Sequence, residues 1–319
     1  MIHEPVTVLD DVHEELLRGD PMLAMDNLFR GLRELREHMS PDDWQSFSTT
    51  TALEHPVRDL IHQDPMVRRS FEKPRGYSGD AVLLDLIYRF HEPRDLTPIG
   101  AAVYDYATQA RPAALAVQNR RRVIARTLDQ VAASTEAPRR VLSVACGHFR
   151  EGLISRAVAD GAFEEVVALD ADERSLSVVS RTFPTENVRV VHQSVRRLLA
   201  RMDLGEFDFA SSAGLYDYLE DRVAQRLTAE LFAMLRPGGK LLICNFVPQI
   251  YDAGFMETYM GWELIFRTET ELMGCARDVP PAEIASFRAW TDAHDAIAYL
   301  ELERAREPAA PPANWPAAL

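Results

Sequence analysis

Small and acidic residues follow two apolar runs in the middle of the chain. A turn with two glycines, 145–152 (ACGHFREG), follows the first run, and Asp170 ends the second run, 23 residues after Gly147. Such a turn lets the backbone approach a ligand. An acid at the end of the second run can accept hydrogen bonds from a ribose diol. The pair predicts a nucleoside site. The alternative is a tight turn and an acid that caps the next helix.

The elements that must position these residues follow a strand–helix rhythm from about residue 139. Apolar, β-branched runs predict five strands, at 141–145, 166–170, 188–192, 207–210 and 240–246, with helices between them. This rhythm is typical of an α/β protein with a doubly wound parallel sheet. Two later strands are expected near 284–290 and 297–304, after a helix that begins with a capping box at 268–271.

The residues before this rhythm predict helices. Apolar side chains recur at helical spacing over 22–39 and 81–88, and Ser40 marks a helix start because a proline and two acids follow it. A long helix is expected from about 99 to 131, bent at Pro112.

Charge and composition narrow the range of possible binding partners. The 319 residues carry a net charge of −14, which disfavours nucleic acid as a substrate because phosphate binding needs a basic face. No apolar run reaches the roughly 18 residues of a membrane span, and no secretory signal is visible, so we expect a cytoplasmic protein without membrane contact. The three cysteines, Cys146, Cys244 and Cys275, are expected to be free and buried, and no spacing predicts a metal site.

Two later features indicate which nucleoside is bound. The segment 235–243 (LRPGGKLLI) matches the turn before the fifth strand in methyltransferases, and the late strand pair fits their last hairpin. Over about 139–304 the sequence resembles the class I S-adenosylmethionine-dependent methyltransferase family. The resemblance implies a Rossmann-like seven-stranded sheet with an antiparallel seventh strand. It also implies S-adenosylmethionine at the carboxyl ends of the first three strands.

The resemblance assigns the cofactor contacts by position. The methionine part would lie against Ala145, Cys146 and Gly147, the ribose against Asp170 and Ala171, the adenine against Gln193 and Ser194, and the end of the fourth strand would contribute Ser212, Ala213 and Gly214. The sequence departs from the family pattern at several of these places. Ser143 stands where an acid is usual, Ala145 replaces the first glycine, Phe149 replaces a third small residue, and Gln193 and Ser194 replace a frequent acid.

A narrower resemblance covers three blocks, 73–80 (KPRGYSGD), 213–219 (AGLYDYL), and 256–257 (ME) together with 262–267 (WELIFR). They look like a bacterial subgroup that includes enzymes described as making hydroxy-fatty-acid methyl esters and proteins of natural-product pathways. This implies a small-molecule acceptor, either a secondary metabolite or a hydroxy acid. In the first block Arg75 could pair with the cofactor's carboxylate, and Tyr77 could cover the sulfonium or the acceptor. The alternative is a structural turn in which Asp80 caps a helix.

Aromatic residues cluster after the fourth and fifth strands, where open sheets bind ligands. They predict an acceptor pocket lined by Tyr218, Phe246, Tyr251, Tyr259 and Trp262, although about half of the aromatic cluster could be core. Methyl transfer is an in-line displacement, and a base is needed only if the acceptor must lose a proton. The candidate bases are His148, Tyr216, Asp217 and Glu257. A carboxylate acceptor would need no base and would favour a cation such as Arg75 or Arg267.

Three parts are therefore expected: a helical region over 1–135 that serves as a cap or lid and in dimerisation, a Rossmann-like methyltransferase domain over 136–306, and a Pro/Ala-rich tail over 307–319. Two other functions stay open. A nicotinamide-dependent oxidoreductase would predict a cleaner glycine pattern and would not account for the turn at 236–239. A non-catalytic protein that binds the cofactor on the same fold would lack turnover. The homodimer is expected from the resemblance alone.

Overall fold

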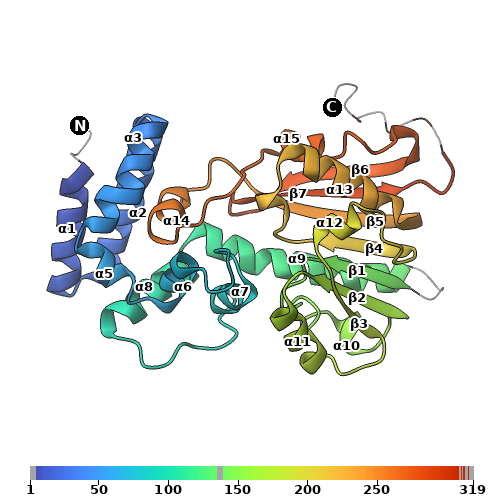
Figure 1. Ribbon diagram of the computed structural model, residues 1–319, viewed down its shortest axis with the longest axis horizontal. Coiled ribbons are helices and arrows are strands. Elements are labelled where there is room, and N and C mark those ends of the chain that lie inside the picture. Colours follow the sequence, from blue (N-terminus) through green and yellow to red (C-terminus); the bar gives the residue numbers. More distant parts are fainter. Residues whose placement is uncertain (1–4, 135–138, 309, 311, 313–314, 316–319) are drawn as a thin grey trace. The chain divides into compact units, whose positions relative to one another are not determined.

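The computed structural model describes residues 5–134, 139–308, 310, 312 and 315. The chain forms a helical unit, residues 1–118 and 249–263, and a sheet unit, residues 119–248 and 264–319 (Figure 1). The division falls inside helix α9 (Pro112–Ser134) rather than at 135–136. The first half of α9 belongs to the helical unit, where the Gln118 amide donates to the carbonyls of Ile87 and Thr108.

Seven strands form the sheet in the order β3-β2-β1-β4-β5-β7-β6. They are β1 (Arg140–Val144), β2 (Glu165–Asp170), β3 (Val188–His192), β4 (Phe207–Ser212), β5 (Leu235–Phe246), β6 (Ile284–Thr291) and β7 (Ile297–Arg304). Strands β1 to β5 pair in parallel, and β7 runs antiparallel to both β5 and β6. The predicted seven-stranded sheet with an antiparallel seventh strand is confirmed. All five predicted parallel strands are present.

Strand β5 begins five residues earlier than predicted. Leu235 already pairs with Phe207, whereas Phe209 pairs with Lys240, so the predicted turn 236–239 is a bulge within the strand. Gly238 has a φ of 83°, a left-handed conformation that favours glycine. The sequence signal was correct about a bend at this place but placed it outside the strand.

Helices cover the sheet and bury its apolar side chains. Helix α11 (Glu173–Thr182) packs on β2 and β3, α13 (Asp221–Ala233) on β5, and α15 (Glu269–Gly274) on β6 and β7. Two short helices complete the crossovers, α10 (Arg156–Ala159) and α12 (Val195–Leu198). The predicted capping box at the start of α15 is confirmed, because Thr268 and Glu271 exchange side-chain and backbone hydrogen bonds. In the tail, the Trp315 ring packs edge-on against Phe287; most of the other residues of 307–319 lie outside the described ones.

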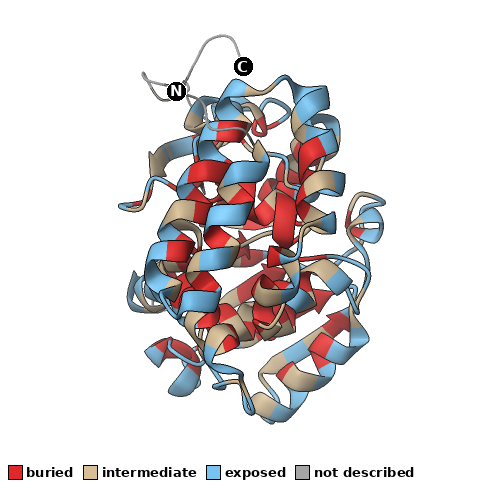
Figure 2. Cartoon of the chain, turned by 90° about the vertical axis from the view of Figure 1, so that its left-hand side faces the viewer, coloured by how far each residue is buried: buried red, intermediate tan, exposed pale blue. Residues whose placement is uncertain are grey.

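The helical unit consists of short helices with buried inner faces, seen as red stripes beside pale-blue ones in Figure 2. They are α1 (Pro5–Arg18), α2 (Pro21–His38), α3 (Pro41–Ser46), a π-helical turn (Phe47–Thr51), α4 (Ala52–Glu54), α5 (Val57–Ile61), α6 (Pro65–Glu72), α7 (Ala81–Ile87), α8 (Pro98–Gln109), the first part of α9, and α14 (Ala253–Tyr259). Ser40 caps α3 as predicted. The single bent helix expected over 99–131 is two helices, because Pro112 starts a new one.

Charged residues hold the inserted segment 249–263 in the helical unit. The Asp252 carboxylate accepts hydrogen bonds from Arg111 Nε at 2.9 Å and from the Ala113 backbone N–H at 2.6 Å. On α14, Glu257 accepts from Arg36 and Trp44. None of the helices in the described part of the chain has the length and apolar character of a membrane span.

Candidate active site

The turn after β1 has an unusual backbone. Ala145, Gly147 and Phe149 all have left-handed φ values, of 52°, 54° and 50°. A non-glycine residue in this region costs about 1–2 kcal/mol, so the turn keeps a glycine-like path at two positions that lack glycine. Burial of the Phe149 ring against Phe183 helps to offset this cost. The departures seen in the sequence therefore change residue types and not the form of the turn.

Asp170, the last residue of β2, ties this turn to the next loop. Its Oδ2 accepts from the Gly147 N–H and its Oδ1 from the Asp172 N–H, both at 2.8 Å. Burial raises the pKa of Asp170, and the backbone N–H bonds oppose that effect. Each oxygen retains a second lone pair, which is the acceptor capacity that a ribose diol needs. Asp172 instead caps α11 through the Arg174 N–H, and the ribose-binding role of Asp170 stays a prediction.

The remaining predicted adenosine contacts lie on the same sheet edge. The Gln193 backbone N–H donates to the Asp170 carbonyl at 3.0 Å, and Gln193 is half-buried. Ala171 and Ser194 are exposed. Their contacts with a cofactor stay predictions.

A buried hydroxyl lies at the end of β4. Ser212 is 1% exposed, and within the described residues its Oγ has no hydrogen-bond partner. A buried polar group left without a partner costs about 1–3 kcal/mol. Ala213 and Gly214, which follow, are half-exposed, as are Ala145 and Gly147. An accessible turn, an acid and an unsatisfied hydroxyl on one sheet edge fit a nucleoside cofactor with a polar methionine part.

The candidate bases differ in their surroundings. Asp217 is buried, and its Oδ1 accepts from the Phe246 N–H at 2.7 Å. Burial raises the pKa of Asp217 to about 7, against the opposing effect of Arg120. His148, in the cofactor turn, is 5% exposed. The prediction of Tyr216 as a candidate base must be corrected, because its ring is fully buried in the sheet core and its hydroxyl forms a hydrogen bond with the Thr228 hydroxyl at 2.9 Å.

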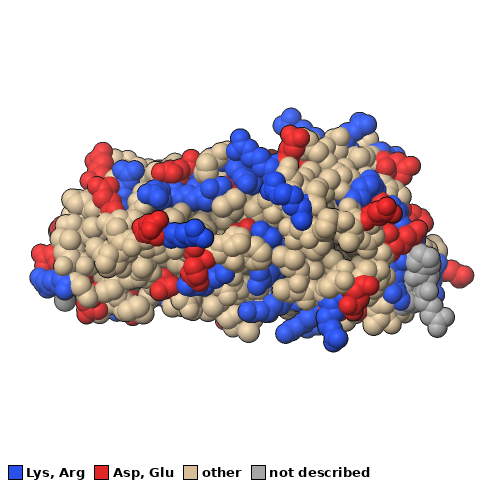
Figure 3. Space-filling view, turned by 90° about the horizontal axis from the view of Figure 1, so that it is seen from below, with Lys and Arg blue, Asp and Glu red and all other residues tan. Residues whose placement is uncertain are grey.

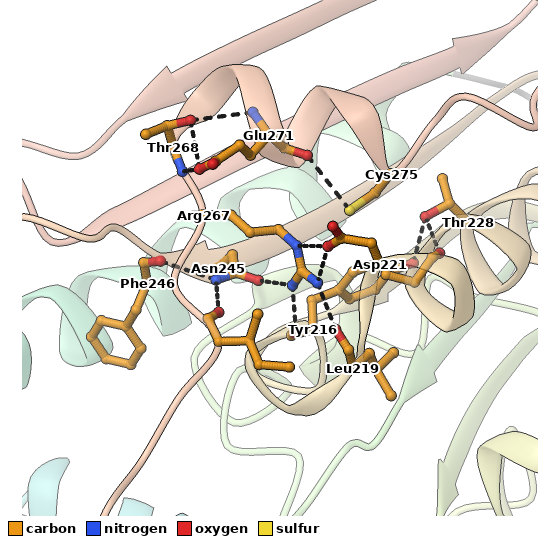
Figure 4. A network of polar contacts seen from close by, with 12 residues as sticks. Tyr216, Leu219, Asp221, Thr228, Asn245, Phe246, Arg267, Thr268, Glu271 and Cys275 are labelled. Carbon is orange, nitrogen blue, oxygen red and sulfur yellow. Dashed lines mark hydrogen bonds and ion pairs between the residues drawn. The ribbon is translucent and has the colours of Figure 1, made fainter. Parts of the chain in front are cut away.

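Glu257 and Arg267 also form structural hydrogen bonds that the sequence did not reveal. Glu257 accepts from Arg36 Nε and Nη2 and from Trp44 Nε1, all at 2.8 Å, within the helical unit. These three donors correct the expectation of a free base at Glu257. The cationic role considered for Arg267 is corrected as well, because its guanidinium is 2% exposed and is engaged by the loop after β4 and by β5 (Figure 4).

The five aromatic residues predicted for the acceptor pocket are divided between the units. Phe246, buried, and Tyr218, exposed, belong to the sheet unit. In the helical unit the Tyr251 ring lies 4.8 Å from the guanidinium carbon of Arg33 and 4.6 Å from that of Arg111. The last two of the five aromatic residues, Tyr259 and Trp262, also belong to the helical unit and are buried. The single pocket stays a prediction.

The three sequence blocks meet in pairs. Ser78 Oγ in the first block donates at 2.8 Å to the carbonyl of Gly261, which directly precedes residues 262–267 of the third block, inside the helical unit. In the sheet unit the Ile265 N–H of the third block donates to the Asp217 carbonyl of the second. Asp80 caps α7, as the structural alternative predicted. Arg75 and Tyr77 lie on the turn between α6 and α7, and their cofactor roles stay predictions.

Sequence reasoning missed Arg120. It lies in a run of polar and basic residues, 119–122 (NRRR), which favours a solvated helix face, yet it is 3% exposed. A Cβ atom at Gly214 would lie 3.4 Å from its Nη2, and its guanidinium carbon lies 6.0 Å from the Phe246 ring centre. The three cysteines are free and buried, as predicted. Among the described residues no cluster of His, Cys, Asp or Glu could hold a metal ion.

Comparison with known proteins identifies the sheet unit. A family model described as a methyltransferase domain matches residues 141–239, which include the turn after β1, Asp170 and Ser212. This match supports S-adenosylmethionine as the cofactor. No curated protein matches the chain.

Solved structures resemble this chain at low sequence identity. A possible exported protein from Bordetella parapertussis is 18% identical, with a TM-score of 0.60 over 84% of this chain and 99% of that chain. The N-methyltransferase NodS from Bradyrhizobium japonicum WM9 is 15% identical, with a TM-score of 0.41 over 59% and 97%. The magnesium protoporphyrin IX methyltransferase from Synechocystis PCC 6803 is 16% identical, with a TM-score of 0.44 over 59% and 87%. Residues 141–239 therefore match a methyltransferase domain, and they lie within a seven-stranded α/β sheet of the Rossmann-like kind.

Proposed function

We propose that the protein is an S-adenosylmethionine-dependent methyltransferase that acts on a small molecule. The observation that carries the proposal is the shared sheet edge of the left-handed turn at 145–149, Asp170 and the unsatisfied Ser212 hydroxyl. When bound, S-adenosylmethionine supplies an electrophilic methyl group. The chain's own residues would bind and orient this cofactor: the Asp170 oxygens would accept hydrogen bonds from the ribose, and the turn would bring its backbone close to the methionine part.

The acceptor chemistry follows from groups on the sheet unit. Asp217 is the base that we propose for an acceptor that must lose a proton, because burial places its pKa near 7 and it lies after β4. An acceptor that is already ionised would not use it. A secondary metabolite or a hydroxy acid is proposed as the acceptor on the resemblance of the three sequence blocks, two of which meet at Asp217 and Ile265.

The proposed partners follow from charge and cofactor. Acidic and basic side chains are interspersed on the face shown in Figure 3, and the net charge is −14, which supports a small acceptor over nucleic acid. A cytoplasmic location and a role in natural-product formation are proposed with the cofactor and the subgroup resemblance. The homodimer and the lid role of the N-terminal helices stay proposals.

Calorimetric titration tests the cofactor site. We expect wild-type protein to bind S-adenosylmethionine and S-adenosylhomocysteine, and Asp170→Asn to bind both about 10- to 100-fold more weakly, because a charged acceptor loses about 1.5–3 kcal/mol when neutralised. The matched control is Asp172→Asn, which changes the neighbouring cap and should bind within about threefold of wild type. Thermal melts verify that both variants fold.

Two outcomes contradict the proposal. One is a wild-type protein that binds neither compound. The other is an Asp170→Asn variant that binds like the control. If binding holds, mass spectrometry of hydroxy acids, aromatic amines and indoles incubated with S-adenosylmethionine tests turnover. Binding without any methylated product across that panel would favour the non-catalytic cofactor-binding alternative.

A further inference from the structure

Two adjacent residues of α14 carry buried hydroxyl groups in the helical unit. Thr258 is 1% exposed and Tyr259 is 0% exposed. Among the described residues, neither the Thr258 Oγ1 nor the Tyr259 hydroxyl has a hydrogen-bond partner. A buried hydroxyl without a partner is unfavourable, because it has lost its hydrogen bonds to water and has gained none in the protein. Two such groups side by side therefore point to a function.

Three other buried threonines show what is unusual about Thr258. Thr108, Thr127 and Thr228 also lie on helices, and each donates to the carbonyl four residues before it, at 2.7, 3.0 and 2.9 Å. This local bond is a common way for a helical threonine to satisfy its hydroxyl. The Thr258 hydroxyl does not form it with the Gly254 carbonyl. It is therefore available to a group from outside its own helix.

The buried tyrosines differ in the same way. The Tyr104 hydroxyl donates to the Leu86 carbonyl at 2.8 Å, and the Tyr216 hydroxyl bonds to Thr228 at 2.9 Å. For Tyr259, burial raises the pKa and no charged group contributes to the shift. A charged ligand group next to this hydroxyl would therefore lack a counter-ion, and burial of an unpaired charge is very costly. The surroundings of Tyr259 favour a neutral group.

Aromatic rings surround Tyr259. Its ring centre lies 5.7 Å from that of Phe255 and 6.5 Å from that of His62, and the Phe71 ring lies 4.8 Å from His62 on the other side. The His62 Nε2 donates to the Tyr259 carbonyl at 2.9 Å, which fixes the imidazole against the end of α14. Sites for small molecules are typically lined by apolar and aromatic side chains with a few polar groups that orient the ligand.

The rest of α14 is held firmly. The carbonyls of Met260 and Gly261, which follow the helix, accept from Ser70 Oγ and Ser78 Oγ at 2.9 and 2.8 Å. The π-helical turn 47–51 packs against α14, and such turns are rare and frequent at functional sites. The hydroxyl pair is therefore presented by a rigid element, as a binding site requires.

We propose that Thr258 and Tyr259 form the polar end of a binding site for a neutral, largely apolar molecule that carries a hydroxyl or carbonyl group. Each hydroxyl can donate one hydrogen bond and accept others, so the pair can satisfy either group. The neighbouring rings supply the apolar wall. If the molecule is the methyl acceptor, for whose pocket the sequence predicted Tyr259, that part rests on the proposed function. The binding itself does not.

Isosteric variants test whether the hydroxyls are without partners in the free protein. Tyr259→Phe and Thr258→Val remove the hydroxyls and nearly keep the shapes of the side chains, so both variants should melt at or above the wild-type temperature. The matched control is Tyr104→Phe, which loses the bond to the Leu86 carbonyl and should melt about 2–4 °C lower. An equal decrease for Tyr259→Phe would overturn the inference.

NMR titration with two matched pairs of compounds measures the ligand class. Phenol is compared with toluene, and cyclohexanol with methylcyclohexane, because each pair exchanges a hydroxyl for a methyl group of similar size. Wild type should bind at least one of the two alcohols. Tyr259→Phe and Thr258→Val should each lower the ratio of alcohol to hydrocarbon affinity by about 3- to 10-fold, the range of one neutral hydrogen bond. Tyr104→Phe should leave the ratio unchanged.

Three results would overturn the inference. Wild type could bind neither alcohol, the ratio could be equal in wild type and both hydroxyl variants, or benzoate could bind more tightly than phenol, which would show a charged site. Titration with S-adenosylhomocysteine keeps the two proposals apart. A protein that binds an alcohol as expected but not S-adenosylhomocysteine retains this site and contradicts the proposed function, and the opposite result overturns this site alone.

Discussion

Replacement of Arg267 by methionine should lower the free energy of unfolding of the sheet unit by more than the loss of an exposed ion pair would. The guanidinium donates to the Tyr216 carbonyl and Asn245 Oδ1, both at 2.8 Å, to the Leu219 carbonyl and to Asp221 Oδ1 (Figure 4). It thereby joins the loop after β4 to β5 and to the start of α13. Methionine has a similar length but donates no hydrogen bond.

The magnitude follows from the acceptors that would lose their donor. Three of them are uncharged and lie in buried or partly buried positions, and each unsatisfied acceptor costs about 1–3 kcal/mol. Partial hydration of the Leu219 carbonyl lowers the sum, so we expect a loss of about 3–5 kcal/mol in the free energy of unfolding. For a unit of this size that loss lowers the melting temperature by about 6–20 °C.

The matched control is the charged partner. Asp221 is 78% exposed, whereas the Arg267 side chain is 2% exposed. Water can replace the Asp221 carboxylate, so Asp221→Asn should cost only about 1 kcal/mol. Urea unfolding followed by circular dichroism measures both variants. Equal losses for the two variants would refute the reasoning, because the ion pair and not the buried acceptors would then account for the stability.

Two further predictions concern the candidate site. Burial raises the pKa of Asp217 from 3.8 to about 7, so the folded protein keeps a proton that the unfolded chain releases, and the contribution of Asp217 to stability falls as pH rises from about 4 to 7. Asp217→Asn lacks this loss, so its stability relative to wild type should increase by at most about 4 kcal/mol between pH 4 and pH 8; urea midpoints across this range check it, and parallel curves would contradict it. Asp64 also has a pKa of about 7, but it is present in both wild type and Asp217→Asn, so its effect cancels in the difference between their stabilities. A Cβ on Gly152 would lie 2.4 Å from Cε1 of the buried Phe149 ring. Gly152→Ala should therefore cost about 1–3 kcal/mol through overpacking and weaken cofactor binding by displacing the turn. The control Gly274→Ala meets no atom within 4 Å and should be neutral; similar melting temperatures for the two variants would show that the turn tolerates the extra carbon.

The sheet could be predicted from the sequence because each strand is marked by a pattern of neighbouring residues. Strands β1 and β2 are nearly continuous apolar runs, which is how a strand covered on both faces looks in sequence. The capping box at 268–271 and the cap at Ser40 depend on residues three apart. The break at Pro112 was recognised as a bend, but sequence alone does not say whether a proline bends a helix or starts a new one.

The failures concern contacts between distant residues. Tyr216 lies in a loop after a strand, and its contact with Thr228 twelve residues later shows that it belongs to the core. Glu257 was a reasonable base until Arg36 and Trp44, more than 200 residues earlier, were found to donate to it. Arg120 has no local signal either. Burial of a single arginine in a basic run is decided by tertiary packing.

Several unfavourable features of the fold lie at the edge of the sheet that carries the candidate site. Left-handed Ala145 and Phe149 strain the backbone, the Ser212 hydroxyl is unsatisfied within the described residues, and Asp217 is buried with a raised pKa. By contrast, the buried Arg267 guanidinium donates to the Tyr216 carbonyl and to Asn245 Oδ1, both at 2.8 Å. Proteins tolerate strain and unsatisfied groups mainly where a ligand relieves them. If S-adenosylhomocysteine relieves these costs, its binding should raise the stability of the wild-type sheet unit more than that of Ser212→Ala, because the variant has no unsatisfied hydroxyl to relieve.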